Sequence, residues 1–297
     1  MHIPVRQFRF SFILTRAVEC PVYHGNAVRG LILAALFGEY ADPKDNAHNL
    51  PVGMVPVVCE FGRIKMLAGE VYTFGINCMG DNADVLAGRM AVLAERFTEI
   101  GQRSLDYWGD SPPIFGGNFI DFKMNELSVA LACNGSGELQ LGIQSGAVTL
   151  QFVSPLKMRS PDEYSERFPL QGNRCFVAKH FFKQLWSNVN KVSPLGPFDE
   201  MPALDGVEVT HKYFVKVETP IWSNHKASGN KHKRKQLQGM LGDVAFANVP
   251  EEWRVLLWYG QFIHVGGNKA YGCGDYVLHG AENPVFELRP DILGSTV

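Results

Sequence analysis

The chain has 297 residues, a net charge of −2 and a pI of about 6.5. With 46% hydrophobic and 20% charged residues, it has the composition of a globular protein with room for two ordinary domains. This balance excludes a largely disordered chain and a protein that coats polyanions by bulk charge, so any contact with a polyanion has to be local. No apolar run approaches the ~20 residues that span a bilayer, and Met1–Arg6 lacks a signal-peptide layout. We therefore expect a cytoplasmic protein that does not bind membranes.

The six cysteines lie far apart in the sequence, and none of them forms a Cys-x-x-Cys pair. They are Cys20, Cys59, Cys78, Cys133, Cys175 and Cys273. Because structural zinc sites are usually built on closely spaced pairs, this pattern disfavours a zinc site. We expect reduced cysteines in the core, no metal site and no cofactor.

Hydrophobic periodicity predicts strands and helices in the N-terminal half. Phe8, Phe10 and Phe12 alternate with polar residues, which is typical of a half-buried strand. Apolar residues from Val28 to Leu36 recur at helical spacing instead. The predicted elements are a strand over Gln7–Leu14, a helix over Asn26–Phe37, a strand over Val71–Cys78, a helix over Asp84–Ile100, and strands over Asn118–Met124 and Leu127–Ala132.

The C-terminal half approximates the same order. Its predicted elements are a strand over Val148–Phe152, a helix over Arg174–Val189, a strand over His211–Thr219, a short helix over Pro250–Tyr259 and a last strand over Tyr276–His279. Each half is close to strand–helix–strand–strand–helix–strand. We therefore predict an α+β protein of two tandem ferredoxin-like (RRM-like, βαββαβ) domains, at residues 1–140 and 141–297. The boundary falls near Gly135–Gly146, which is rich in glycine and serine.

The most distinctive motif is the segment His264–Tyr276, which belongs to the second domain. Four glycines, Gly266, Gly267, Gly272 and Gly274, fall within nine residues, after an apolar run and before a strand. A Walker loop is excluded because there is no Gly-Lys-Ser/Thr, and a dinucleotide fingerprint is excluded because the glycines precede a strand. One interpretation is a loop that holds a polyanion against its N–H groups. The other is a glycine-rich hairpin with His264 on an alternating strand.

Three segments together resemble one known family. They are Lys235–Val244, Trp253–Tyr259 and the glycine segment. They resemble the C-terminal signature of the CRISPR-associated endoribonucleases that process repeat RNA, the sixth Cas family within the RAMP superfamily. Weaker resemblances in the same order extend over nearly the whole chain, at Gly25–Gly30, Gly69–Ile76, Gly116–Phe119 and Val148–Pro155.

The resemblance implies that the chain cuts CRISPR repeat RNA (pre-crRNA) to mature guide RNA without a metal ion. The 2′-hydroxyl before the scissile phosphate attacks in line and leaves 2′,3′-cyclic phosphate and 5′-hydroxyl ends. The implied partners are repeat RNA or crRNA, with other Cas proteins of an effector complex as a further option. An alternative stays open, in which the chain is a non-catalytic crRNA-binding RAMP subunit with the same fold.

Histidine suits the acid and base of such a reaction because its pKa of ~6.5 is near working pH. His48 fits the family's histidine position, because it lies 15 residues beyond Leu33. At the position of Leu33 itself, some members of the family have a tyrosine. His24, with Tyr23 beside it, precedes the first helix and is the second candidate. The alternative roles are a loop histidine for His48 and a turn or capping residue for His24.

A basic run supplies the other half of the predicted site. Thr219–Gly242 contains no acidic residue. The predicted RNA-binding residues of this run are Trp222, Lys226, Lys231, Lys233, Arg234 and Lys235, joined by Arg29 of the first helix and by Gly266, Gly267, Lys269, Gly272 and Gly274 of the glycine segment. The alternatives are a solvated loop for the run and a salt bridge for Arg29.

Overall fold

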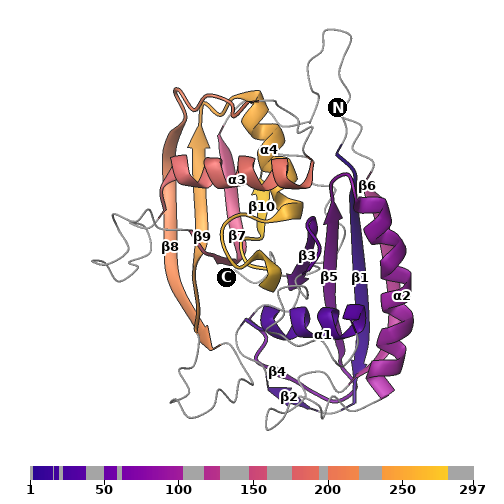
Figure 1. Ribbon diagram of the computed structural model, residues 1–297. Coiled ribbons are helices and arrows are strands. Elements are labelled where there is room, and N and C mark those ends of the chain that lie inside the picture. The colour runs from indigo at the N-terminus through magenta and orange to yellow at the C-terminus, as the bar shows by residue number, and fades with distance from the viewer. Residues whose placement is uncertain are drawn as a thin grey trace, which may run out of the picture.

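The computed structural model of the chain describes residues 3–15, 17–19, 23–37, 50–58, 62–102, 117–127, 147–158, 176–193, 200–220 and 236–279. These residues form two four-stranded antiparallel sheets, each with its own pair of helices (Figure 1).

The N-terminal sheet has the strand order β3-β5-β1-β6. Its elements are β1 (Val5–Leu14), α1 (Gly25–Phe37), β3 (Met54–Val58), β5 (Val71–Met79), α2 (Ala83–Gln102) and β6 (Gly117–Leu127), with a small side sheet of β2 (Val18–Glu19) and β4 (Lys65–Met66). The alternating phenylalanines of β1 point into a core shared with α1 and α2, where Phe8 and Phe10 are fully buried. The expected strand is therefore confirmed, with one face toward the helices, but it is more than half-buried because Val5, Gln7 and Ser11 on its other face are also buried.

The C-terminal sheet has the strand order β10-β7-β9-β8. Its elements are β7 (Val148–Leu156), α3 (Ala178–Val192), β8 (Glu208–Pro220), β9 (Gln236–Ala247), α4 (Glu251–Ile263) and β10 (Tyr276–His279). An aromatic cluster fills the space between this sheet and α3, in which Phe152, Phe181 and Phe246 are at most 4% exposed.

The two sheets have the same topology. If each domain's strands are numbered in chain order, both sheets have the order 2-3-1-4, with one helix after the first strand and one after the third. This is the ferredoxin-like arrangement. The predicted α+β fold of two tandem ferredoxin-like domains is confirmed. The boundary between residues 140 and 141 lies outside the described residues and stays a prediction.

Several element predictions need correction. Leu127 is the last residue of β6, so it does not begin a separate strand, and residues 128–132 lie outside the described part of the chain. Four strands, the two-residue β2 and β4 and the longer β3 and β9, were not predicted at all. β3 is a wholly buried run interrupted by Pro56, and it is an edge strand, which tolerates the missing N–H. β9 runs through a stretch that we read only as a family motif.

Helix α4 is longer than the predicted Pro250–Tyr259, because it continues to Ile263. Every residue from Val255 to Ile263 is buried. One side of α4 packs on the C-terminal sheet, and its end contacts β5 and β3 of the N-terminal sheet. From Val255 onward the helix therefore has no exposed face, and its last turn looks like an apolar strand in the sequence.

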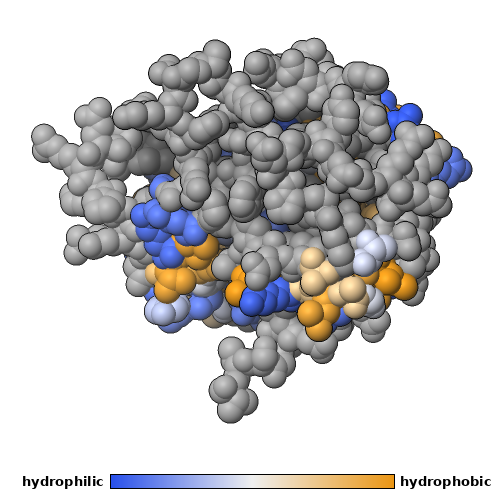
Figure 2. Space-filling view, turned by 90° about the horizontal axis from the view of Figure 1, so that it is seen from below, coloured by the Kyte–Doolittle hydropathy of each residue, from blue (hydrophilic) through white to orange (hydrophobic). Residues whose placement is uncertain are grey.

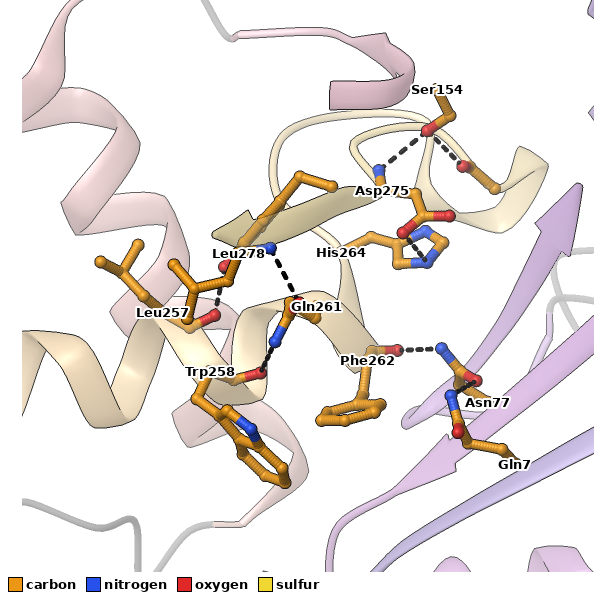
Figure 3. A network of polar contacts seen from close by, with 12 residues as sticks. Gln7, Asn77, Ser154, Leu257, Trp258, Gln261, Phe262, His264, Asp275 and Leu278 are labelled. Carbon is orange, nitrogen blue, oxygen red and sulfur yellow. Dashed lines mark hydrogen bonds and ion pairs between the residues drawn. The ribbon is translucent and has the colours of Figure 1, made fainter. Parts of the chain in front are cut away.

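Polar contacts connect α4 to the N-terminal domain. The Asn77 side chain of β5 donates to the Phe262 carbonyl at 3.1 Å and accepts from the Gln7 amide at 3.2 Å (Figure 3). The Ile3 N–H donates to the Tyr259 hydroxyl at 3.4 Å. Ile3 also belongs to the core cluster of the C-terminal domain, together with Val5, Val55 and Met79. The two domains are therefore joined by one continuous core.

On the lower end of the molecule, neither hydrophobic nor hydrophilic side chains predominate among the described residues. In Figure 2 its coloured surface alternates between hydrophilic and hydrophobic groups. Exposed apolar side chains such as Ile64 and Leu67 occur in the same stretch of chain as the Arg63–Glu70 ion pair, whose N–O distance is 2.7 Å. Scattered apolar residues of this kind are ordinary on soluble surfaces.

The interdomain contact at Gly80 generates a first prediction. Gly80 has φ +102, and an added Cβ would lie 2.1 Å from the Val192 carbonyl oxygen of the other domain. Gly69 has φ +85 but open space around an added Cβ. We expect Gly69→Ala to lower the free energy of unfolding by about 1 kcal/mol, from backbone strain alone. Gly80→Ala should lower it by at least about 3 kcal/mol, because the interface must also shift. Urea unfolding of both variants checks this, and equal losses would contradict the predicted clash.

Candidate functional site

The glycine loop, residues 264–275, connects α4 to β10 and is fastened along the end of β7. Gly267 N donates to the Lys157 carbonyl at 2.6 Å, and Gly274 N donates to the Pro155 carbonyl at 3.1 Å. In return, Asp275 O accepts from Val153 N at 3.0 Å. The loop therefore extends the sheet edge and is not a simple hairpin.

The glycines are explained first by packing. Gly274 has φ +79, and an added Cβ would lie 1.7 Å from the Val265 carbonyl oxygen. Gly266 has φ +91, and its Cβ would lie 2.5 Å from the Lys157 carbonyl oxygen. The N–H groups of Gly267, Gly272 and Gly274 already donate to backbone carbonyls. These three N–H groups are therefore occupied and do not face a polyanion, which corrects part of the prediction from the sequence.

Ser154 of β7 clamps the closing turn of the loop. Its hydroxyl donates to the Gly272 carbonyl at 2.8 Å and accepts from Asp275 N at 2.8 Å (Figure 3). Ser154 is 2% exposed, so both partners would be left without water if the hydroxyl were removed. The sequence reading missed this residue, because a lone serine in a strand gives no signal.

Tyr23 reaches the same turn from the N-terminal domain. Its side chain is 3% exposed and hydrogen bonds with Cys273 and Ser154. A Cβ on Gly272 would lie 2.8 Å from both the Tyr23 hydroxyl and the Pro56 carbonyl oxygen, so this glycine permits the close approach. Burial, with the nearby Cys273 and Asp275, raises the pKa of Tyr23 well above its usual value. The phenol is therefore neutral near pH 7 and unsuited to act as a base.

His264 begins the loop but is not on a strand, so that expectation was wrong. It follows α4 directly with φ +59, a left-handed conformation, and its N–H still bonds to the Gly260 carbonyl. Its Nε2 lies 3.6 Å from Asp275 Oδ1, and both side chains are buried (Figure 3). The Asn188 side chain donates to its carbonyl at 3.2 Å. His264 therefore belongs to the internal support of the loop.

The remaining candidates divide by position. His24 is 2% exposed and packs 5.6 Å from the Tyr72 ring, measured between centroids, so its ring lies in the core. Arg29 is half-buried in α1. His48 and the basic set Trp222, Lys226, Lys231, Lys233, Arg234 and Lys235 lie outside the described residues. The structure therefore brings together Tyr23 and the glycine loop from opposite domains.

Lys269 is the cation of the loop. It begins η5 (Lys269–Tyr271), a single turn that contacts α1 and β3 of the N-terminal domain. Burial and the neighbouring Lys191 lower its pKa from 10.5 to about 8. A desolvated ammonium of this kind gains from an anion beside it, so Lys269 is the strongest described candidate for a phosphate contact.

Two searches among the described residues gave no further site. No group of three or more His, Cys, Asp and Glu side chains in this part of the chain is arranged to hold a metal ion. No helix among the described residues is long and apolar enough to cross a membrane.

One structural neighbour of these tandem ferredoxin-like domains, at 12% identity and a TM-score of 0.51, is described as an RAMP protein that binds different RNA substrates. Residues 150–276 match the family described as CRISPR-associated endoribonuclease Cas6. The chain matches this family over these residues, and the resemblance seen in the sequence is confirmed there. No curated protein matches the sequence.

Solved structures share this fold at low identity. A partial Cas6-RT-Cas1–Cas2 complex has a TM-score of 0.63 at 12% identity over 95% of this chain, which spans only 47% of that chain. A Thermus thermophilus Cas6 product complex has a TM-score of 0.53 at 15% identity, covering 93% of this chain and 99% of the relative. A Cas6-related protein from Pyrococcus furiosus has 0.53 at 10%, covering 93% and 98%. At such identities the likeness shows the fold alone.

Lys269 gives a prediction of how the free energy of unfolding depends on pH. Its pKa is about 8 when folded and 10.5 as the ordinary value, so the folded state binds the proton more weakly. The cost of burying the charge is fully present below pH 8 and disappears as pH rises to 10.5. We expect Lys269→Met to be more stable than the parent by about 2 kcal/mol at pH 7, a difference that shrinks toward pH 10.

Urea unfolding at pH 7, 8.5 and 10 measures this difference. Lys183→Met, which removes an exposed lysine of α3, is the matched control and should give a difference independent of pH. A Lys269→Met difference that is equally flat would contradict the burial argument.

Proposed function

We propose that this chain is a metal-independent endoribonuclease that cuts CRISPR repeat RNA in pre-crRNA and leaves 2′,3′-cyclic phosphate and 5′-hydroxyl ends. The observation that carries the proposal is the Cas6 family match over residues 150–276, which includes the whole glycine loop. In the structure this loop contacts the first helix of the other domain through η5. Residues of both halves therefore meet where the proposed site lies.

The reaction needs a base for the 2′-hydroxyl, an acid for the leaving oxygen and positive charge near the phosphorane. Of the three predicted catalytic residues, Tyr23 and His24 are buried, and burial keeps Tyr23 neutral. We therefore assign the acid–base role to His48 and treat Tyr23 and His24 as parts of the surrounding core.

The positive charge is proposed to come from two places. Lys269 of the loop is half-buried, with a lowered pKa, and would hold the scissile phosphate or one next to it. Arg29 of α1 is half-buried on the helix that η5 contacts and is proposed as a second phosphate contact.

A second contact region follows from the β8–β9 hairpin. β8 pairs with β9 from Glu208↔Ala247 to Pro220↔Gln236, whereas β7 pairs with β9 only from Val148↔Phe246 to Leu156↔Met240. The far end of the hairpin therefore extends beyond the sheet (Figure 1). It leads into residues 221–235, which hold Trp222 and the five basic residues. We propose that this end of the hairpin binds the RNA backbone away from the cleavage point.

The partner is proposed to be repeat RNA, and the product is proposed to stay available as crRNA for other Cas proteins. The names of two relatives describe product complexes or complexes with RT, Cas1 and Cas2, and these names concern the relatives. The chain spans less than half of the two Cas6-RT-Cas1–Cas2 complex chains that it matches, at 47% and 29% of their length.

Cleavage without metal tests the proposal. We expect the purified chain to cut its cognate repeat RNA in EDTA, because histidine acid–base chemistry needs no metal. The upstream product, which carries the cyclic phosphate at its 3′ end, should resist ligation at that end until the cyclic phosphate is opened, as end-group analysis on gels would show. Activity that appears only with added Mg²⁺ would contradict the mechanism.

His48→Ala is the matched variant in the same assay. Loss of a general acid or base typically slows a reaction ~100-fold or more, while RNA affinity should change little. Its loss of activity also excludes a contaminating nuclease. Tight binding of repeat RNA by the parent without any cleavage would instead favour a non-catalytic crRNA-binding subunit.

The basic run predicts a salt effect on binding. Replacing Lys231, Lys233, Arg234 and Lys235 together by Ser should weaken RNA binding and flatten the plot of log K against log salt. Each lost phosphate contact is worth a slope change of ~0.7–0.9, because fewer counterions are released. Titrations at four salt concentrations measure the slope. A slope equal to that of the parent would mean that these are solvated charges outside the RNA path.

A further inference from the structure

We propose that Ser154 and Tyr23 are positioning residues. They hold the glycine loop against the first helix, so that Lys269 keeps a fixed position relative to groups of the N-terminal domain. The inference deepens the proposed function and rests on it. Neither residue belongs to the reacting groups, because both side chains lie in the interior, at 2% and 3% exposure.

The first step of the argument is the geometry at Ser154. Its hydroxyl bonds to the Gly272 carbonyl and to the Asp275 N–H, both at 2.8 Å, and so grips the turn Gly272–Asp275 at its two ends. The neighbouring bonds of the loop to β7 are made by main chain alone, at Pro155 and Lys157. Ser154 is therefore the one β7 side chain, among the bonds in the described residues, that fixes the closing turn.

The second step is the link to the other domain. Tyr23 lies two residues before α1 and hydrogen bonds with Ser154 and Cys273. The positive φ of Gly272, +75, and its lack of a Cβ let the Tyr23 hydroxyl come within 2.8 Å of where that atom would be. The hydroxyls of Tyr23 and Ser154 thus form one cluster, which ties the start of α1 to the loop.

The third step concerns Lys269, the group that this cluster holds in place. Directly before the clamped turn, η5 carries Lys269 onto α1 and β3. If the turn moves, Lys269 moves relative to the groups on the N-terminal domain. A misplacement of about 1 Å between reacting groups can slow a reaction ~100-fold without loss of binding. The cluster should therefore act on the rate of cleavage and not on affinity.

The test uses Ser154→Ala, Tyr23→Phe and the double variant, with Ser11→Ala as control. Ser11 is also a buried strand serine, but its hydroxyl bonds to Thr73 on the N-terminal sheet. Single-turnover cleavage of repeat RNA at saturating protein gives the rate, and a separate titration gives Kd. We expect each single variant to cleave ~10–100-fold more slowly with Kd within ~3-fold of the parent, and Ser11→Ala to match the parent.

The double variant should be no slower than the slower single variant, because both hydroxyls act through one cluster. Hydrogen exchange of the amides of residues 265–276 should quicken in both single variants and not in Ser11→Ala. If Ser154→Ala does not fold, Tyr23→Phe, which deletes one oxygen, decides the question.

Parental cleavage rates in both variants would overturn the inference, as would a loss of affinity that accounts for the whole loss of rate. If the parent itself does not cleave repeat RNA, the proposed function fails. Hydrogen exchange then still decides whether the cluster fixes the loop, and unchanged exchange in both variants refutes it.

Discussion

The burial of α4 on all sides from Val255 to Ile263 is the constraint on which the rest of this structure depends. A helical segment with no solvated face needs two partners, and here these are the C-terminal sheet on one side and the N-terminal sheet on the other. The Asn77 amide satisfies the carbonyl of Phe262 at the point where the helix end meets the other domain. The relative position of the two domains is therefore set by a core, which is far stiffer than a linker.

The position of the glycine loop is set by this helix, because the loop follows directly from its end. It leaves α4 at His264 in a left-handed conformation, runs back along β7 and enters β10. Its glycines let carbonyls of Val265 and Lys157 approach where any side chain would clash. The loop is thus a built part of the domain junction. Its buried polar groups, Ser154, Tyr23 and the His264–Asp275 pair, support the turn that carries the half-buried Lys269.

The domain junction and the β8–β9 hairpin suit different parts of the proposed chemistry. Phosphoryl transfer to a neighbouring 2′-hydroxyl needs few reacting groups but precise placement of charge. A rigid junction between two domains can hold such groups more precisely than an isolated loop. The long β8–β9 hairpin, in contrast, extends away from the core and suits contacts that follow an RNA backbone over a distance.

The sequence by itself determined the fold class, because periods of two and near four survive wherever apolar residues keep to one face of an element, as in β1 and α2. It also showed the resemblance to the family that matches residues 150–276, since the glycine spacing is local in the chain. It could not show the full length of α4, whose two buried faces erase the helical period. Nor could it find Ser154 or show that Tyr23 and His24 are buried. Burial, and contacts between residues 118 positions apart such as Ser154 and Gly272, are decided only when the chain folds in three dimensions.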